Sequence, residues 1–154
     1  MQELSTKYFG TVEYEDRQII RFRAGLPAFE TELWFVAIAP AAAAPLVFLQ
    51  SGATPDLCFL ALPVDAVDSA YALELSDEDQ RELGIAPNSI WRSDSNLAGF
   101  ALVTVHPEGP VTANLLAPVV VNVANGRGWQ AVRMDRTYSH QHPVRLAREE
   151  ALCS

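Results

Sequence analysis

The hydrophobic pattern of this 154-residue chain is a series of short apolar runs, which predicts β-structure almost throughout. Each run is rich in β-branched and aromatic side chains, which favour strands. Successive runs follow too closely for crossover helices, so antiparallel pairing is favoured over a parallel sheet. We predict a mostly β fold, a small antiparallel β-barrel-like single domain with short peripheral helices. The predicted strands are residues 8–14, 18–22, 33–38, 46–50, 57–62, 100–105, 118–123 and 129–134.

Two regions of this pattern need a choice between alternatives. The runs 8–14 and 18–22 are separated by three charged residues, a spacing that predicts a hairpin between them. Residues 33–55 carry no charge over 23 residues, which is long enough for a membrane span. Pro40 and Pro45 flank four alanines in its middle, so two strands joined by an Ala/Pro loop explain it better. We expect no membrane segment.

Residues 76–84 carry the clearest helix signal. Ser76 can cap the first amides, and acidic residues suit the positive end of the helix dipole. Gly84 can adopt the left-handed backbone conformation that ends a helix. The helix spans only about two turns, so it needs packing of Leu83 and Ile85 against the sheet. Pro143 can begin a second short helix, and we divide the chain into a β domain over 1–142 and a tail over 143–154.

The net charge is −8, from 11 Lys+Arg against 19 Asp+Glu. This charge repels nucleic-acid phosphates and anionic membranes and favours a basic macromolecular partner, although many proteins are acidic for solubility alone. The basic residues are too dispersed for a nucleic-acid stripe. We interpret those of the C-terminal third as surface residues that aid solubility or contact partners: Arg127, Arg133, Arg136, Arg145 and Arg148.

Cysteine usage and the N-terminus favour a cytoplasmic protein. Cys58 and Cys153 form no redox or metal spacing and no disulfide framework. The first residues lack a basic segment followed by an apolar one, so no secretory signal is expected. We expect a monomer.

Candidate chemistry is sparse. The eight glycines form no phosphate-binding or nucleophile motif, and Cys58 in its apolar run is a small hydrophobe rather than a nucleophile. His140 and His142 could share a metal on an extended strand, but no third ligand follows at a suitable spacing. Acidic residues at the start of a helix are usually solvated caps rather than acid/base pairs. We therefore expect no enzyme, cofactor or metal, with a small-molecule or metal-binding β-barrel as the alternative.

The stretch TANLLAPVVVN at 112–122 leads furthest toward function. It resembles the signature of the bacterial flagellar assembly factor family, FliW. Further segments match that family in the same order: TKYFGTVEY at 6–14, GLPAFE at 25–30, FLQS at 48–51, PDLCFLAL at 55–62, the ELSDEDQRELGI region, VTV at 103–105 and the GWQ after the last turn. The sequence departs from the family pattern in a longer 89–98 segment and in Gln141, which replaces an arginine.

The resemblance implies a non-enzymatic, barrel-like protein that binds flagellin and, alternatively, the RNA-binding carbon storage regulator CsrA. Flagellin that accumulates would occupy the assembly factor and free the regulator to repress flagellin translation; flagellin secretion would reverse this. An acidic protein suits a basic regulator by charge complementarity.

The candidate contact residues follow from these partners. For the regulator we select the acidic group, with a capped, solvated helix as the alternative: Glu74, Asp77, Glu78, Asp79 and Glu82. Asn114 is a further candidate, although a structural role in satisfying backbone groups, shared with Asn122, is favoured. Flagellin's terminal segments are apolar, so an apolar groove is expected near the turn at 25–30 or the loop at 39–45. Its candidate residues are Phe29, Trp34 and Phe48.

Overall fold

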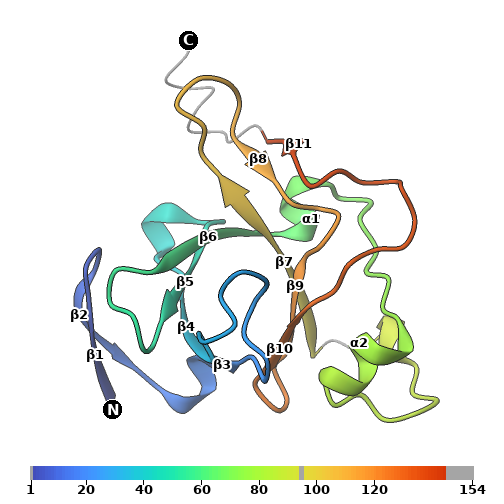
Figure 1. Cartoon of the computed structure of the whole chain (residues 1–154), viewed down its shortest axis with the longest axis horizontal. Helices are drawn as coiled ribbons and strands as arrows, with labels where there is room; N and C mark the ends of the chain where they lie inside the picture. Colours follow the sequence, from blue (N-terminus) through green and yellow to red (C-terminus); the bar gives the residue numbers. More distant parts are fainter. Residues whose placement is uncertain (1, 94–95, 145–154) are drawn as a thin grey trace.

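A computed structural model describes residues 2–93 and 96–144 of the chain (Figure 1). The strands are β1 (Gln2–Thr6), β2 (Gly10–Tyr14), β3 (Ile19–Arg21), β4 (Trp34–Ile38), β5 (Val47–Ser51), β6 (Cys58–Pro63), β7 (Leu97–Thr104), β8 (Thr112–Ala113), β9 (Val119–Asn122), β10 (Arg127–Gln130) and β11 (His142–Pro143). The helices are α1 (Val64–Val67) and α2 (Asp77–Glu82), with single 3-10 turns η1 (Asp16–Gln18), η2 (Ala41–Ala43) and η3 (Trp91–Ser93).

The main sheet closes on itself as a barrel. Its strands follow the order β3, β4, β5, β6, β7, β9 and β10, and β10 returns to β3. Neighbours are antiparallel except β10 and β3, which are parallel through Arg127 and Arg21. Strand β7 is long enough to pair with β9 at its start and β8 at its end. The mostly β, barrel-like single domain is therefore confirmed, with one parallel pairing in the seam.

The barrel interior is filled by alternate residues of these strands. Phe22, Phe35, Leu49 and Val119 are almost completely buried there. Gly128 lies on the inner side of β10, where a Cβ atom would come within 2.6 Å of the Ile20 and Phe22 side chains. The side chains inside the barrel at the seam are therefore in van der Waals contact with the β10 backbone, as is usual in close-packed protein cores.

The N-terminal strands correct our prediction for residues 8–22. Strand β2 pairs with β1, not with β3, and the two form a separate hairpin beside the barrel (Figure 1). The intervening charged residues form η1, after which β3 turns to pair with β4. The first residues, in which Leu4 stands between polar neighbours, form a strand that the pattern did not predict. Leu4 and Tyr14 pack against Val36 on the outer face of the barrel.

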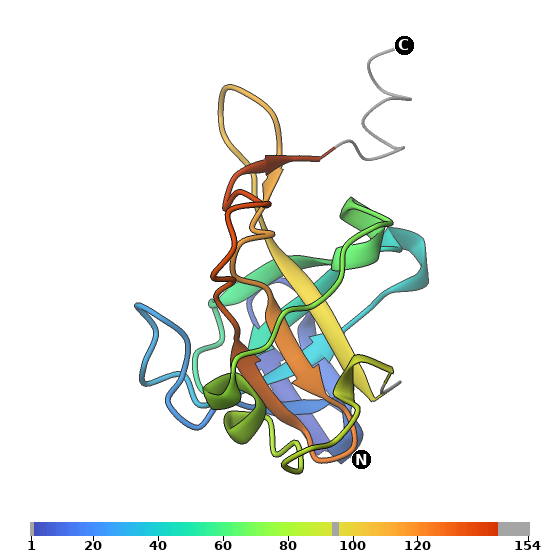
Figure 2. The same cartoon turned by 90° about the vertical axis from the view of Figure 1, so that its right-hand side faces the viewer.

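Strand β9 is buried on both faces, which explains the unbroken apolar run in the 112–122 stretch. Val119 and Val121 face the interior, while Val120 packs against Leu83, which follows α2, on the outside. A strand covered on both faces loses the alternating pattern of a half-exposed strand. Figures 1 and 2 show α2 on the outer side of β9 and β10, and the β7–β8 loop rising from the far end of the barrel.

Two further predictions concern the ends and the uncharged segment. Residues 33–55 fold as β4, η2 and β5, as expected for two strands joined by an Ala/Pro loop. None of the helices in the described ranges is long and apolar enough to cross a membrane. Pro143 lies in β11, paired with Thr112, and so does not begin a helix as predicted. Residues 145–154 of the predicted tail lie outside the described residues.

Candidate partner-binding surface

Helix α2 forms as its sequence predicts, around a reciprocal cap. The Ser76 hydroxyl accepts a hydrogen bond from the Asp79 amide at 3.1 Å, and the Asp79 carboxylate accepts one from the Ser76 amide at 2.8 Å. Gly84 ends the helix with φ +71. The Leu83 carbonyl at this end is also satisfied, since the side chains of Asn122 and Asn125 both donate to it. The capping prediction is confirmed.

Asp79 is part of the fold rather than of the solvent-facing surface. Its side chain is only 7% exposed, and its second carboxylate oxygen accepts a hydrogen bond of 2.7 Å from the Trp129 indole nitrogen. One carboxylate therefore joins the helix cap to β10. Of the predicted acidic contact residues, Asp79 is the one that the structure places inside.

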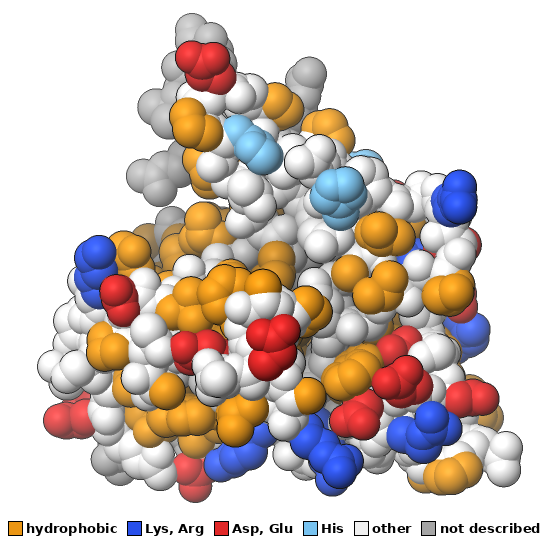
Figure 3. Space-filling model, viewed as in Figure 1, with side chains coloured by type: hydrophobic (Ala, Val, Ile, Leu, Met, Phe, Trp, Pro, Cys, Tyr) orange, Lys and Arg blue, Asp and Glu red, His pale blue; other side chains and the backbone are white. Residues whose placement is uncertain are grey.

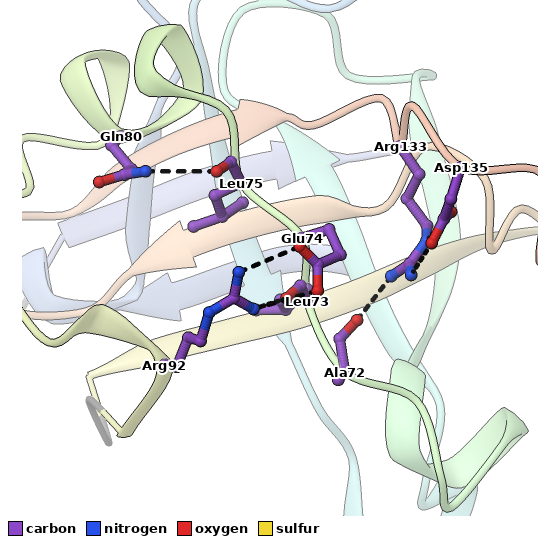
Figure 4. Close-up of polar contacts among 8 residues, drawn as sticks. All are labelled: Ala72, Leu73, Glu74, Leu75, Gln80, Arg92, Arg133 and Asp135. Atoms are coloured by element: carbon purple, nitrogen blue, oxygen red, sulfur yellow. Dashed lines mark hydrogen bonds and ion pairs between the residues drawn. The ribbon is translucent and has the colours of Figure 1, made fainter.

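Glu74 lies just before α2 and is paired with an arginine. Arg92 donates to both Glu74 carboxylate oxygens, at 3.0 and 3.1 Å (Figure 4). These hydrogen bonds lower the pKa of Glu74, and they also raise the pKa of Arg92. Arg92 in turn lies 4.4 Å from the ring centre of Trp91, which belongs to the long 89–98 segment. The ion pair is exposed to water, so it orients Glu74 more than it stabilises the fold.

Residues 71–76 form an extended segment that joins α1 to α2 and lies along the barrel. Tyr71, Leu73 and Leu75 turn toward the protein, and the residues between them face solvent. Side chains from other elements bind its carbonyl groups: Arg133 binds that of Ala72, Arg92 that of Leu73, and Gln80 that of Leu75 (Figure 4).

Gly99 allows the 71–76 segment to lie close to β7. A Cβ atom at this position would lie 2.9 Å from the Leu73 side chain and 3.2 Å from Val64. Such contacts are tighter than ordinary van der Waals separation, so any larger residue would push the segment outward. The position of the segment therefore depends on a glycine in the strand beneath it.

Arg133 holds the same segment from the other side, and its position differs from the surface role we predicted. It is 8% exposed, its guanidinium forms two hydrogen bonds to Asp135 at 2.8 and 2.7 Å, and it lies about 5 Å from the rings of Tyr71 and Tyr138. The bond to Arg133 lowers the pKa of Asp135, and burial raises the pKa of Tyr71.

Strand β10 ends at Gln130, not at residue 134 as predicted, but Arg133 lies on the same face of the chain as Trp129 and Ala131, which the 71–76 segment covers. The chain continues along the barrel, with the amides of Ala131 and Arg133 bonded to the carbonyls of Pro118 and Leu116. This alternation places Arg133 between the barrel and the 71–76 segment and leaves Val132 and Met134 exposed, Met134 at 90%. The sequence did not indicate this arrangement, because arginine is usually exposed and apolar residues are usually buried, and here the reverse holds.

These residues together form what we call the acidic surface: Glu74, Asp77, Glu78, Val132, Met134 and Asp135. A hollow of about 260 Å³ lies at its centre, lined by residues that include Glu74, Met134 and Asp135. Asp77 and Glu78 are exposed on α2, and within the described ranges neither has an ion-pair partner. Figure 3 shows acidic side chains gathered around α2 on this face. Val132, Met134 and Asp135 were not predicted.

Glu82 and Asn114, the two other predicted polar contacts, lie away from this surface. Glu82 is half-buried and lines a hollow with Arg23 and Arg127 on another side of α2. The Asn114 side chain accepts a hydrogen bond from the Ala117 amide at 2.9 Å and is half-buried. The structural interpretation of Asn114 is supported by this bond, and a role in partner contact stays a prediction.

The apolar candidates do not form one groove. Phe29 is 37% exposed and packs on Phe59, with 5.1 Å between ring centres. Phe48 and Trp34 lie on the outer face of the barrel near the N-terminal hairpin, where Phe48 contacts Phe9 at 5.0 Å and Trp34 contacts Tyr14 at 6.1 Å. Trp34 lines a hollow of about 590 Å³.

His140 and His142 raised the alternative of a metal site. Such a site would need several ligands close together. Among the residues that the structure describes, no three His, Cys, Asp or Glu side chains lie close enough to hold one ion. His142 lies in β11, with its ring 6.5 Å from that of Tyr138, and His140 is exposed. The Cys58 thiol is half-buried, and burial raises its pKa, which disfavours the nucleophilic thiolate.

The fold defines the class of protein: a small mixed β-barrel with additional strands and two short helices. A crystal structure of the flagellar assembly factor FliW is similar over 94% of this chain and 98% of its own, with a TM-score of 0.80 and 30% sequence identity. The sequence model of the FliW protein family matches residues 3–144. The chain belongs to the FliW family of flagellar assembly factors.

Relatives named as flagellar assembly factor FliW support this assignment over most of the chain. The protein of Syntrophomonas wolfei is 32% identical over 136 residues, which cover 88% of this chain and 83% of the relative. That of Heliobacterium modesticaldum is 34% identical over 141 residues, covering 90% and 88%. That of a Geobacillus species, strain WCH70, is 32% identical over 141 residues, covering 91% and 93%.

Proposed function

We propose that this protein binds flagellin and, alternatively, the translational regulator CsrA in the cytoplasm, and so couples the flagellin level to flagellin translation. The observation that carries the regulator half of the proposal is the acidic surface. It combines exposed carboxylates on α2 with an exposed methionine and valine beside a hollow. An RNA-binding regulator carries basic surface for phosphates, and such a surface is complementary to this one.

The structure supports a narrower set of contact residues than the sequence did. Asp77 and Glu78 are exposed and can meet a basic side chain, whereas Glu74 is already bonded to Arg92 and Asp79 to Trp129. Met134 adds a flexible apolar contact, of the kind that adapts well to a partner surface. We infer that Asp77, Glu78 and Met134 make the main contacts and that Asp79 contributes only through the fold.

A charge-neutral double variant tests this site. Asp77→Asn with Glu78→Gln should weaken CsrA binding about tenfold and reduce its dependence on salt, measured by calorimetric titration at two salt concentrations. Glu13→Gln with Asp65→Asn is the matched control, because it removes the same charge from exposed positions on β2 and α1. Equal affinity in the two double variants would exclude the acidic surface as the regulator site.

Flagellin binding is proposed through apolar side chains, and the separation of the three candidates makes them distinguishable. Phe29→Ala changes an exposed loop, whereas Trp34→Ala and Phe48→Ala change the barrel face near the hairpin. The variant that loses flagellin binding in a pull-down with purified flagellin, while retaining CsrA binding, identifies the region. Full flagellin binding by all three variants would contradict an apolar contact at these residues.

A further inference from the structure

A second charged region lies at the seam of the barrel, on the outer side of β3 and β10. Two hollows meet there, one of about 590 Å³ and one of about 400 Å³, and both are lined by Arg21 and Arg23. The smaller hollow also includes Arg127. We call this continuous region the arginine groove. Figure 3 shows basic side chains along the lower edge of the molecule, beneath the positions of β3 and β10 in Figure 1.

The strand pairing holds two of these arginines opposite each other. Arg127 is the direct partner of Arg21 in the β10–β3 pairing. Both side chains point outward, because their neighbours Gly128 and Phe22 pack in the interior. Like charges directly opposite on adjacent strands destabilise a sheet, so this arrangement has a cost in the free protein.

None of the groove arginines forms an ion pair within the described residues. The three ion pairs found there involve Arg17, Arg92 and Arg133, and none involves Arg21, Arg23 or Arg127. One carboxylate, Glu82, lines the smaller hollow without reaching ion-pair distance. On a chain with net charge −8, cations left unpaired in a concave site are a favourable location for an anionic group of a partner.

The other half of the groove is apolar. It is lined by Tyr14, Ile19, Leu33 and Trp34, with Leu33 about half exposed. The Trp34 indole lies flat against Gly52, where a Cβ atom would approach to 2.1 Å, so the ring is held in one position. A fixed aromatic wall beside guanidinium groups suits a ligand that carries an apolar side chain next to carboxylates.

We propose that the arginine groove binds a segment of a partner protein in which two or more acidic side chains flank an aromatic or aliphatic one. The guanidinium groups would each take a carboxylate, and the apolar side chain would rest against Trp34 and Leu33. A nucleic acid fits less well, since the protein as a whole repels phosphates. A small inorganic anion would leave the apolar half unused. This inference goes beyond the proposed function, because it requires neither flagellin nor CsrA.

A random peptide library displayed on phage tests the specificity of the groove without assuming the identity of the partner. The protein is used as bait, and the Arg21→Glu, Arg23→Glu variant removes peptides that bind elsewhere. We expect the enriched peptides to combine Asp or Glu with Phe, Leu or Trp. Enrichment of basic or uncharged peptides, or of peptides that the variant retains, would overturn the proposal, as would the absence of enrichment.

A selected peptide then separates binding from folding. In fluorescence anisotropy, Arg21→Gln with Arg127→Gln should weaken its binding about tenfold, as expected for lost charge-assisted hydrogen bonds. Arg81→Gln with Arg136→Gln, at exposed positions outside the groove, is the matched control and should leave binding unchanged. The urea midpoint of the groove variant should equal or exceed that of the parent, because the like-charge pair is relieved. A clearly lower midpoint would show that these arginines stabilise the fold, and would overturn the proposal. Competition by phosphate or single-stranded DNA as strong as competition by the unlabelled peptide would contradict a peptide site.

Discussion

The acidic surface and the arginine groove carry opposite charges, and they differ in how much of that charge is used by the fold. At the acidic surface Glu74 and Asp135 are bonded to Arg92 and Arg133, and Asp79 beneath it caps a helix. In the arginine groove, Arg21 faces Arg127 across a strand pairing with no ion-pair partner in the described ranges. Net charge alone would have pointed only to the acidic surface. We therefore select contact residues by whether their charge is paired: Asp77 and Glu78 at the acidic surface, and Arg21 and Arg127 in the groove.

Arg133 should have the greatest influence on stability, because it supports the acidic surface from within. Arg133→Ala would leave Asp135 without its partner and the Ala72 carbonyl without its donor. We expect a loss of about 3 kcal/mol in the free energy of unfolding, measured with urea, from the unsatisfied carbonyl and from the lost packing of the Arg133 side chain on Tyr71 and Tyr138. Arg136→Ala, at the exposed position next to Asp135, is the control and should change stability by less than about 0.5 kcal/mol. Similar effects of the two variants would show that Arg133 does not support the 71–76 segment.

Asp79 should follow Arg133 in its effect on stability. Asp79→Ala removes the acceptor for both the Ser76 amide and the Trp129 indole. The expected cost is about 2 kcal/mol, the sum of a lost cap and a buried donor left unpaired. The neighbouring Asp77→Ala should cost far less, because Asp77 is exposed. Thermal unfolding of the two variants measures this difference between Asp79, which stabilises the fold, and Asp77, which is free to contact a partner. Equal unfolding midpoints would contradict these two roles.

The division of the acidic group could not have been predicted from the sequence. The motif at 76–84 predicted the helix, its cap and its end, because these depend on neighbouring residues. Which carboxylate would be buried depended on Trp129, which lies 50 residues further along the chain. Arg21 faces Arg127 because β10 closes the barrel beside β3, and this long-range pairing likewise has no local sequence signal. Local signals therefore predicted the elements, and long-range pairing decided which charges remained unpaired.

Two errors in the predicted β-structure also arose from long-range packing. Residues 129–134 are rich enough in apolar residues to predict one strand, but β10 ends at Gln130, and Arg133 rather than Val132 is buried beneath the 71–76 segment. The N-terminal hairpin was missed because only one of its first-strand residues, Leu4, packs on the barrel. In contrast, the buried strand β9 was predicted correctly, since burial on both faces makes its sequence continuously apolar.

Glu74 provides a smaller and more selective test of the acidic surface. Glu74→Gln removes an exposed ion pair with Arg92, so stability should change little. Regulator affinity should also change less than in the Asp77, Glu78 variant, since the Glu74 charge is already compensated. Titration calorimetry of the two variants under one salt condition gives the comparison. A larger loss of affinity for Glu74→Gln would show that bonded carboxylates, not unpaired ones, make the contact.

Asp135 should give the weakest effect, a pH dependence of stability. Its bond to Arg133 lowers the pKa below the ordinary value of 3.8, so the folded state binds fewer protons than the unfolded state around that pH. The contribution is present above pH 3.8 and is lost as the pH falls through the folded pKa. Urea midpoints recorded from neutral to acid pH should therefore fall more steeply for the parent protein than for Asp135→Asn. Parallel curves would show that the Asp135 carboxylate is not held by Arg133.

Alternative binding of flagellin and of a basic regulator, with the regulator at the acidic surface, is the main function that we propose for this member of the FliW family. The most direct measurement is a calorimetric titration with the flagellin and the CsrA of the same cell, first separately and then in competition. We expect binding of both, displacement of CsrA by flagellin, and weaker binding of CsrA alone by the Asp77→Asn, Glu78→Gln variant. Binding of neither partner, or CsrA binding that flagellin leaves unchanged, would contradict this function.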